Sequence, residues 1–253
     1  MSTQAAASAC VPPARFPVSR RELMAFGWFP LFRPKHIALD GARFRIIRRG
    51  SSRRHYLVIH GNEETARQVL EMFMEAHHGI AFVIETHTRN VQINSVELDP
   101  NRMFSRAGAE SNLKMLNPGW TPEQLESALA LLDQRRKRLL KAFLPPPQGL
   151  LVALHNNSPA YSVNDEVPIS DSVSLSEPQN PHAFFLCTDP MDFAVLAKSP
   201  YNVVLQHNKP QEDDGSLSRL AAKRGLRYIN LEVSNGDLER QSKMLEWLNA
   251  NMK

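Results

Sequence analysis

The sequence Tyr56-Leu57-Val58-Ile59-His60-Gly61-Asn62-Glu63 decides the fold and indicates a function. Its apolar half predicts a buried strand, and the helical spacing of apolar residues after Glu63 predicts a helix. An imidazole and a carboxylate therefore stand one turn apart, where a strand passes into a helix. A divalent metal ion favours such a nitrogen and oxygen pair on rigid backbone. The stretch predicts two ligands of a metal site.

Apolar runs and cap residues predict further strands and helices on both sides of this stretch. The expected strands span residues 42–48, 55–59, 80–84, 150–154, 183–187, 203–206 and 228–233. The expected helices span residues 63–77, 110–115, 121–143, 189–197, 216–224 and 237–251. We expect residues 91–101 to be irregular or extended. Residues 156–181, rich in Ser, Asn and Pro, predict a long loop that could cover a site.

Strands that are apolar throughout and alternate with helices predict an α/β fold. We expect a mixed, mostly parallel central sheet flanked by helices on both faces. His60 and His155 follow the ends of two expected strands, and Glu232 lies near the end of another. Ligand sites of open α/β sheets lie at the carboxyl ends of the strands. We therefore expect these three side chains to converge at one edge of the sheet.

Size and composition narrow the class of protein. The chain has 253 residues, of which 42% are hydrophobic, enough for one large domain with its own core. Residues 1–20 predict an N-terminal arm, and residues 21–253 a single domain. The net charge of +4 is mild, and the basic run Arg135-Arg136-Lys137-Arg138 lacks interleaved aromatic residues. We therefore expect no nucleic-acid partner.

The sequence gives no strong targeting or membrane signal. No stretch is long and apolar enough to span a bilayer, so we expect no membrane partner. Ser19-Arg20-Arg21 is faintly similar to a twin-arginine export signal, but the apolar stretch after it is short and no cleavage site follows. We therefore expect a cytoplasmic protein. Its two cysteines, Cys10 and Cys187, do not indicate a disulfide framework.

Four short motifs stand out in order along the chain. They are His60-Gly61-Asn62-Glu63, Asp99-Pro100-Asn101-Arg102, Leu154-His155-Asn156 and Leu231-Glu232-Val233. Together they resemble the signatures of the zinc carboxypeptidase superfamily, and they are most similar to its succinylglutamate desuccinylase and aspartoacylase branch. The resemblance spans about residues 55–235. Each motif is weak alone, but four in this order are specific, and they imply a zinc carboxypeptidase-like fold.

The resemblance also implies a metal site and its chemistry. It implies that His60, Glu63 and His155 hold one zinc ion per chain. Three protein ligands leave a fourth position open for water, as in a catalytic rather than a structural site. Glu232 is implied as the general base that takes a proton from that water.

The resemblance further assigns substrate-binding roles. Asn101 and Arg102 are implied to hold a substrate carboxylate, the guanidinium acting as a two-pronged donor. A second arginine polarises the scissile carbonyl in this superfamily, and Arg89 is our candidate by position alone. One departure from the family pattern is Ala153, which stands where relatives often carry an acid. Support for the ring of His155 is therefore expected from elsewhere.

These inferences predict a zinc-dependent hydrolase that cleaves an amide bond next to a carboxylate. The motif contexts favour a deacylase that acts on an N-acyl amino acid. A metallocarboxypeptidase acting on short or cell-wall peptides is the alternative, and Tyr161 in the expected long loop keeps it open. A third class is a non-catalytic binding protein that has retained the fold. Metal content distinguishes it, because such a protein need not bind stoichiometric zinc.

Overall fold

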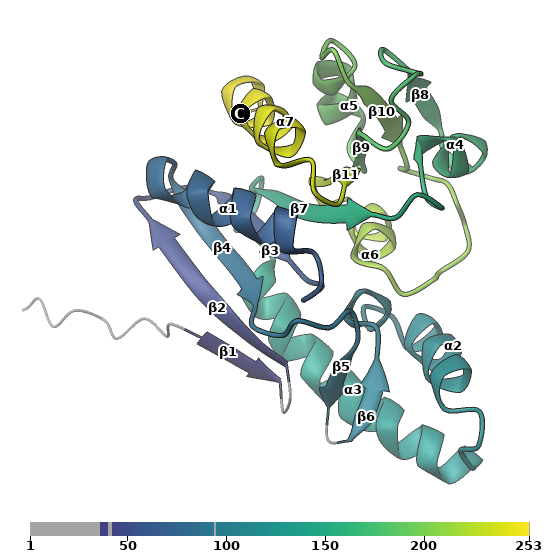
Figure 1. The fold of residues 1–253 in the computed structure, drawn as a ribbon. Helices are drawn as coiled ribbons and strands as arrows, with labels where there is room; N and C mark the ends of the chain where they lie inside the picture. The colour runs from purple at the N-terminus through teal and green to yellow at the C-terminus, as the bar shows by residue number, and fades with distance from the viewer. Residues whose placement is uncertain (1–35, 40–41, 94, 253) are drawn as a thin grey trace, which may run out of the picture. The chain divides into compact units, whose positions relative to one another are not determined.

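A nine-stranded mixed β-sheet with helices on both faces forms the part of the chain that the structure describes (Figure 1). The structure is a computed structural model and describes residues 36–39, 42–93 and 95–252. The expected arm at residues 1–20 lies outside these ranges. Within them, the expected α/β fold with a mixed sheet and helices on both faces is confirmed.

The central strands of the sheet run parallel, and the outer strands add antiparallel pairs. Across the sheet the order is β1 (His36–Leu39), β2 (Ala42–Arg49), β4 (Gly79–Ile84), β3 (Arg54–Val58), β7 (Leu150–Asn157), β11 (Tyr228–Ser234), β9 (Phe184–Cys187), β10 (Asn202–Leu205) and β8 (Ser172–Ser174). The strands β4, β3, β7 and β11 are parallel neighbours. At their two sides, β2 pairs with β4 and β9 pairs with β11 in antiparallel fashion. The carboxyl ends of the four central strands therefore lie at one edge.

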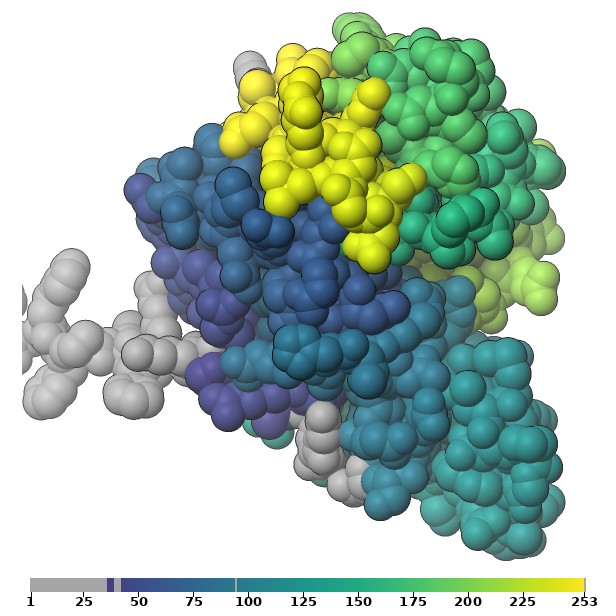
Figure 2. All heavy atoms as spheres, in the orientation of Figure 1, coloured from purple at the N-terminus to yellow at the C-terminus, as the bar shows by residue number. Residues whose placement is uncertain are grey.

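Helices cover both faces of this sheet. One face is covered by α1 (Glu64–Ala76), α5 (Pro190–Leu196) and α7 (Leu238–Asn251), and the other by α2 (Arg106–Leu116), α3 (Pro122–Phe143) and α6 (Leu217–Lys223). Successive strand residues point to opposite faces, so Tyr56 and Val58 pack with α1 whereas Leu57 packs with α3. Figure 2 shows α7, in yellow, against the blue α1 segment. No helix in the described ranges is long and apolar enough to cross a membrane.

Two local expectations are wrong. Strand β7 does not end before His155 but continues to Asn157, because residues 151–157 pair with residues 228–234 of β11. Residues 156–181 are not one long loop: they contain α4 (Val163–Glu166), a 3-10 turn and the edge strand β8. Residues 91–101, expected to be irregular or extended, contain a separate hairpin of β5 (Val91–Ile93) and β6 (Val96–Leu98), so the extended alternative is the one that forms. For β7, β8 and the hairpin, pairing with a partner strand determines the structure more than the local composition does.

Candidate metal centre

The turn between β3 and α1 positions the first two candidate ligands. His60 lies two residues after the end of β3, and Glu63 is the residue immediately before α1. The glycine between them is required by space, because a Cβ at Gly61 would lie 2.4 Å from the carbonyl oxygen of Thr86. The Gly61 N–H donates to the carbonyl of Thr88 at 3.0 Å. This close approach fixes a tight turn that brings the Glu63 carboxylate beside the His60 ring.

The next two candidate residues come from neighbouring strands of the sheet. His155 on β7 and Glu232 on β11 are direct partners in the parallel register. Partner residues of paired strands project to the same face of a sheet. Only 4% of His155 and 6% of Glu232 is exposed. The register therefore holds an imidazole and a carboxylate side by side in a nearly dry environment.

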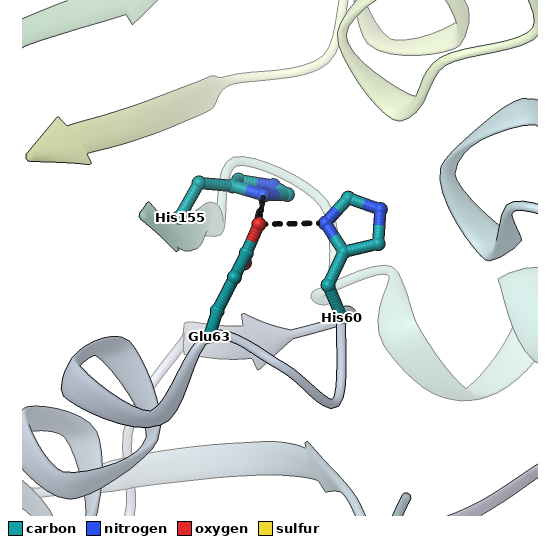
Figure 3. A group of neighbouring side chains, drawn as sticks. All are labelled: His60, Glu63 and His155. Carbon is teal, nitrogen blue, oxygen red and sulfur yellow. Dashed lines mark hydrogen bonds and ion pairs between the residues drawn. The ribbon is translucent and has the colours of Figure 1, made fainter. Parts of the chain in front are cut away.

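The three candidate ligands meet with the Glu63 carboxylate between two imidazoles (Figure 3). Glu63 Oε1 lies 2.8 Å from His60 Nδ1 and 3.3 Å from His155 Nδ1. One donor atom from each residue lies within 4.8 Å of the other two. All three residues are buried. This group can hold a metal ion, as the sequence predicted.

One atom of this group shows that the residues fit a cation. Glu63 Oε2 is buried and accepts no hydrogen bond, although His155 Nδ1 lies 3.2 Å away. A buried carboxylate oxygen without a donor is costly, and native structures rarely leave one. A metal ion bound between the carboxylate and the two rings would satisfy it. The donor set of two imidazole nitrogens and one carboxylate is also one that divalent transition metals accept.

The charges of these groups are coupled. Burial raises the pKa of Glu63, but the imidazoles of His155 and His60 outweigh it and lower this pKa to about 2. Burial lowers the pKa of His60, but the carboxylates of Glu63 and Asp99 outweigh it and raise this pKa to about 9. Without a metal ion, His60 is therefore protonated at neutral pH. A metal ion would replace that proton, because a ligating imidazole must be neutral.

Asp99 is a member of this site that the sequence reasoning left without a role. Its Oδ1 lies 2.9 Å from His60 Nε2, on the side of the ring opposite Glu63. The backbone N–H of Asp99 donates to Asn112 Oδ1 at 2.9 Å, which fixes the aspartate in place. A carboxylate on the far nitrogen orients a ligating histidine and increases its basicity. Asp99 is the first residue of the motif Asp99-Pro100-Asn101-Arg102, and this place in the motif could have indicated its role.

Arg89 lies at the site, as its position in the sequence suggested. Its Nη2 lies 3.0 Å from Asp99 Oδ2, and its Nη1 lies 3.8 Å from Glu63 Oε1. The side chain is 49% exposed and lines the cavity described below. Arg89 therefore presents a positive charge at the rim of the candidate metal site. Its other edge is available to a ligand in the cavity.

Glu232 is a buried carboxylate beside the metal-binding group. Its Oε1 accepts a hydrogen bond from Asn230 Nδ2 at 2.9 Å. Burial, with the negative charge of Glu63 added, raises the pKa of Glu232, and the nearby His155 only partly opposes this. A carboxylate whose pKa is raised in a cavity is suited to accept and release a proton. The structure thus brings Glu232 to the three candidate ligands.

Asn101 and Arg102 also reach the cavity, but each is partly engaged by the protein. Asn101 Oδ1 accepts from the backbone N–H of Leu217 at 3.0 Å. Arg102 Nη1 donates to the carbonyl of Asn101 at 3.0 Å and lies 3.4 Å from Asp214 Oδ2. Asn101 therefore has a structural role that the sequence did not predict. The side chain of Arg102 is 34% exposed and faces the carboxylate of Asp214.

A single cavity of about 780 Å³ joins all these groups. It is lined by every site residue that the sequence predicted: His60, Glu63, Arg89, Asn101, Arg102, His155 and Glu232. Its other wall comes from the segment after β7 and from the start of α6, and includes Tyr161, Glu166, Asp214 and Arg219. Of these, the sequence drew attention only to Tyr161. Contacts between segments so far apart in the chain leave no local signal.

No protein-family model matches the chain, and no curated protein is similar enough to count as a relative. The resemblance to the zinc carboxypeptidase superfamily therefore stays a prediction from four motifs. The arrangement of the site rests on the geometry alone.

Proposed function

We propose that this protein is a zinc-dependent hydrolase of the zinc carboxypeptidase-like fold that cleaves an amide bond near a substrate carboxylate. One observation carries the proposal. The side chains of His60, Glu63 and His155 come together in a buried site, and Glu232 lies beside them. Two imidazoles and a carboxylate suit zinc and leave a position open, as catalytic zinc sites do. An N-acyl amino acid is the preferred substrate class, because the motifs are most similar to those of deacylases.

The chain's own residues supply the proton transfers. Zinc held by the three ligands would act as a Lewis acid and would make an activated water available near neutral pH. Glu232 takes the proton from the attacking water at Oε2, since its Oε1 is already held by Asn230 Nδ2. It then passes that proton to the leaving nitrogen. The buried environment that raises the pKa of Glu232 suits both steps.

Two arginines interact with the negative charges of the substrate. One binds its carboxylate, and the other stabilises the charge that develops on the oxygen of the scissile carbonyl. Arg102 binds the carboxylate through the part of its guanidinium that is open to the cavity. Arg89, next to Asp99 and Glu63, stabilises the oxygen of the scissile carbonyl as it gains charge. Positive charges at both ends of the cavity orient a substrate with one end at the metal and the other at Arg102.

One observation favours the second candidate, a carboxypeptidase acting on short or cell-wall peptides. Tyr161 lines the cavity, and its hydroxyl donates to Glu166 Oε1 at 2.6 Å. Burial raises the pKa of Tyr161, and the charge of Glu232 adds to this, so the phenol stays a neutral donor. A phenol in the cavity wall is a group that a peptide substrate could use. Metal content separates both enzymes from a binding protein that has kept the fold.

The deciding experiment measures zinc and hydrolysis in the same preparations. The full-length protein, purified without chelator, is expected to contain about one zinc ion per chain and to hydrolyse N-acyl amino acids faster than short peptides. The variant Glu232→Gln is expected to keep its zinc and to lose at least ~100-fold in turnover, the lower end of the contribution of a general base. Zinc-loaded Glu232→Gln with wild-type turnover would show that the role of Glu232 is wrong.

Glu64→Gln serves as the matched control. Glu64 is adjacent to the ligand Glu63, but its side chain is 57% exposed and pairs with His87 outside the cavity. This variant is expected to keep both zinc and activity. Protein without stoichiometric zinc, or with zinc and no amide hydrolysis under any condition, would favour the non-catalytic class.

A further inference from the structure

Asp214 is a carboxylate in the wall of the cavity to which the proposed function assigns no role. It lies in the connection between β10 and α6, and it lines the cavity together with Arg102 and Arg219. Its Oδ2 lies 3.4 Å from Arg102 Nη1, and its Oδ1 accepts from the backbone N–H of Ser216 at 2.9 Å. The side chain is 43% exposed. The arginine that is proposed to bind the substrate carboxylate therefore has a fixed carboxylate beside it.

The backbone holds Asp214 in this place. The carbonyl of Gly215 accepts from the N–H of Phe104 at 2.9 Å, and the N–H of Leu217 donates to Asn101 Oδ1 at 3.0 Å. Gly215 has a φ of +78°, and a Cβ there would lie 2.2 Å from the carbonyl oxygen of Arg102. No other residue fits this approach without a shift of the chain. These contacts hold the backbone at Asp214 beside the turn that carries Arg102, and the N–H of Ser216 holds the Asp214 carboxylate.

Two arginines face Asp214, but neither holds its carboxylate through a short hydrogen bond. Arg102 and Arg219 are the positive groups that face it; burial lowers the pKa of Arg219, and the charge of Asp214 opposes this shift. Arg219 Nη1 already donates to Gln206 Oε1 at 2.8 Å. The other carboxylate of this wall, Glu166, accepts from Tyr161 and Gln206. Asp214 is therefore the carboxylate of this wall that can accept a hydrogen bond from a ligand in the cavity, and it lies directly beside the guanidinium of Arg102.

A carboxylate and a guanidinium side by side recognise a ligand that carries both charges. A substrate carboxylate on Arg102 comes close to Asp214 and is repelled unless a positive group lies next to it. An α-ammonium group is in that position in an amino acid, and a charge-assisted hydrogen bond to Asp214 would stabilise it. A carboxylate without this neighbour leaves the repulsion uncompensated.

We infer that Asp214 determines substrate specificity, accepting the ammonium group of a substrate whose carboxylate Arg102 binds. The head group is then an amino acid zwitterion. Because its α-nitrogen is free, the acyl group that is cleaved is carried by another nitrogen, as in an amino acid acylated on its side chain. The inference rests on the proposed function for the role of Arg102 and for the cleavage step, but binding of the head group can be tested without cleavage.

The kinetic test uses pairs of substrates that differ in one group. Diamino acids acetylated on the side-chain nitrogen, from diaminopropionate to lysine, are each compared with the analogue that lacks only the α-amino group. The wild-type protein is expected to favour the amino form by about tenfold in kcat/KM, the size of one hydrogen bond between charged groups. Asp214→Asn is expected to remove this preference. It keeps an Oδ1 for the N–H of Ser216, so the loop retains its cap.

Glu212→Gln is the matched control, since it removes the same charge from an exposed position in the same loop. It is expected to retain the tenfold preference. Wild-type protein with no preference for the amino form, or Asp214→Asn with the preference intact, overturns the inference.

A binding measurement separates this inference from the proposed function. Norvaline and pentanoate, which differ only in the α-amino group, are titrated calorimetrically into the wild-type, Asp214→Asn and Glu212→Gln proteins, with and without added zinc. Preferential binding of norvaline that Asp214→Asn abolishes supports the inference even if no amide is hydrolysed, in which case only the proposed function fails. Equal binding of the two ligands to the wild-type protein overturns the inference even where hydrolysis is found.

Discussion

The two ends of the cavity hold their charged side chains in different ways. At the metal-binding end, His60, Glu63 and His155 are 1%, 3% and 4% exposed and contact one another. At the recognition end, the side chains of Arg102 and Asp214 are 34% and 43% exposed and meet at 3.4 Å. In the first set, His155 lies on the central strand β7, and His60 and Glu63 lie in the tight turn between β3 and α1. In the second set, Arg102 lies in a 3-10 turn and Asp214 in the connection between β10 and α6. The charged groups at the metal-binding end are therefore the ones most removed from water.

This difference has a consequence for energetics. Charges in a dry environment interact strongly, so removing one partner leaves the others uncompensated. Half-exposed pairs are screened by water, and each contributes little by itself. We expect substitutions at the metal-binding end to decide whether the site works at all. Substitutions at the recognition end should change only which ligand is preferred.

The largest effect should follow from removing the charge between the two imidazoles. Glu63→Gln replaces the carboxylate with an amide, a weak zinc ligand that carries no charge. Its zinc affinity is expected to fall by more than the ~100-fold that marks the upper range for a supporting residue. Competition with a chromophoric chelator measures this. Glu64→Gln is the control, and unchanged affinity in Glu63→Gln would remove Glu63 from the ligand set.

A smaller effect should follow from Asp99→Asn, which leaves all three ligands in place. The variant loses the carboxylate behind His60 Nε2, and its zinc affinity is expected to fall about tenfold. Both proteins are titrated at several pH values, because Glu63 and Asp99 raise the pKa of His60 and its proton competes with zinc more strongly as the pH falls. Glu97→Gln, two residues away and facing Asn90, is the control. An affinity loss equal to that of Glu63→Gln would instead make Asp99 a ligand.

Much of the metal-binding end could be predicted because its residues lie on regular structure or directly beside it. The apolar run before His60 and the helical spacing after Glu63 are local signals, and both elements form where they were expected. Glu232 lies within its expected strand. His155 was expected after the end of its strand but lies inside β7, since the strand is extended by pairing with β11. The partner changed the boundary, but not the edge of the sheet to which the side chain belongs.

The recognition end could not be predicted in the same way. Asp214 is separated from Arg102 by more than a hundred positions, and the two meet only because Gly215 lies against the backbone of the turn at Arg102. Asn101 was expected to bind substrate, but its side-chain oxygen holds the N–H of Leu217. Such contacts depend on how loops cross one another in three dimensions. A sequence pattern of period two or three to four carries no information about them.

The smallest effect should follow from a change at Asp171, which lies just before β8 and holds the loop that carries Asp214. Asp171 Oδ2 accepts from the backbone N–H groups of His207, Asn208 and Lys209, at 2.7, 2.8 and 3.1 Å. Burial raises the pKa of Asp171, but these three donors outweigh it and lower the pKa below the ordinary value of 3.8. The native state therefore favours the ionised form. Its stabilising contribution is present above about pH 4 and is lost as the pH falls further.

Asp171→Asn is expected to lower the free energy of unfolding by about 1 kcal/mol near neutral pH, a value already reduced for solvent screening. The difference from the wild-type protein should shrink in acid, where the wild-type Asp171 also becomes neutral. Urea denaturation at a series of pH values measures both, with Glu212→Gln as the control in the same loop. If this loop and the metal-binding end are energetically independent, the zinc affinity of Asp171→Asn stays at the wild-type value. A parallel loss of zinc affinity would show that the loop and the metal-binding end are energetically coupled rather than independent.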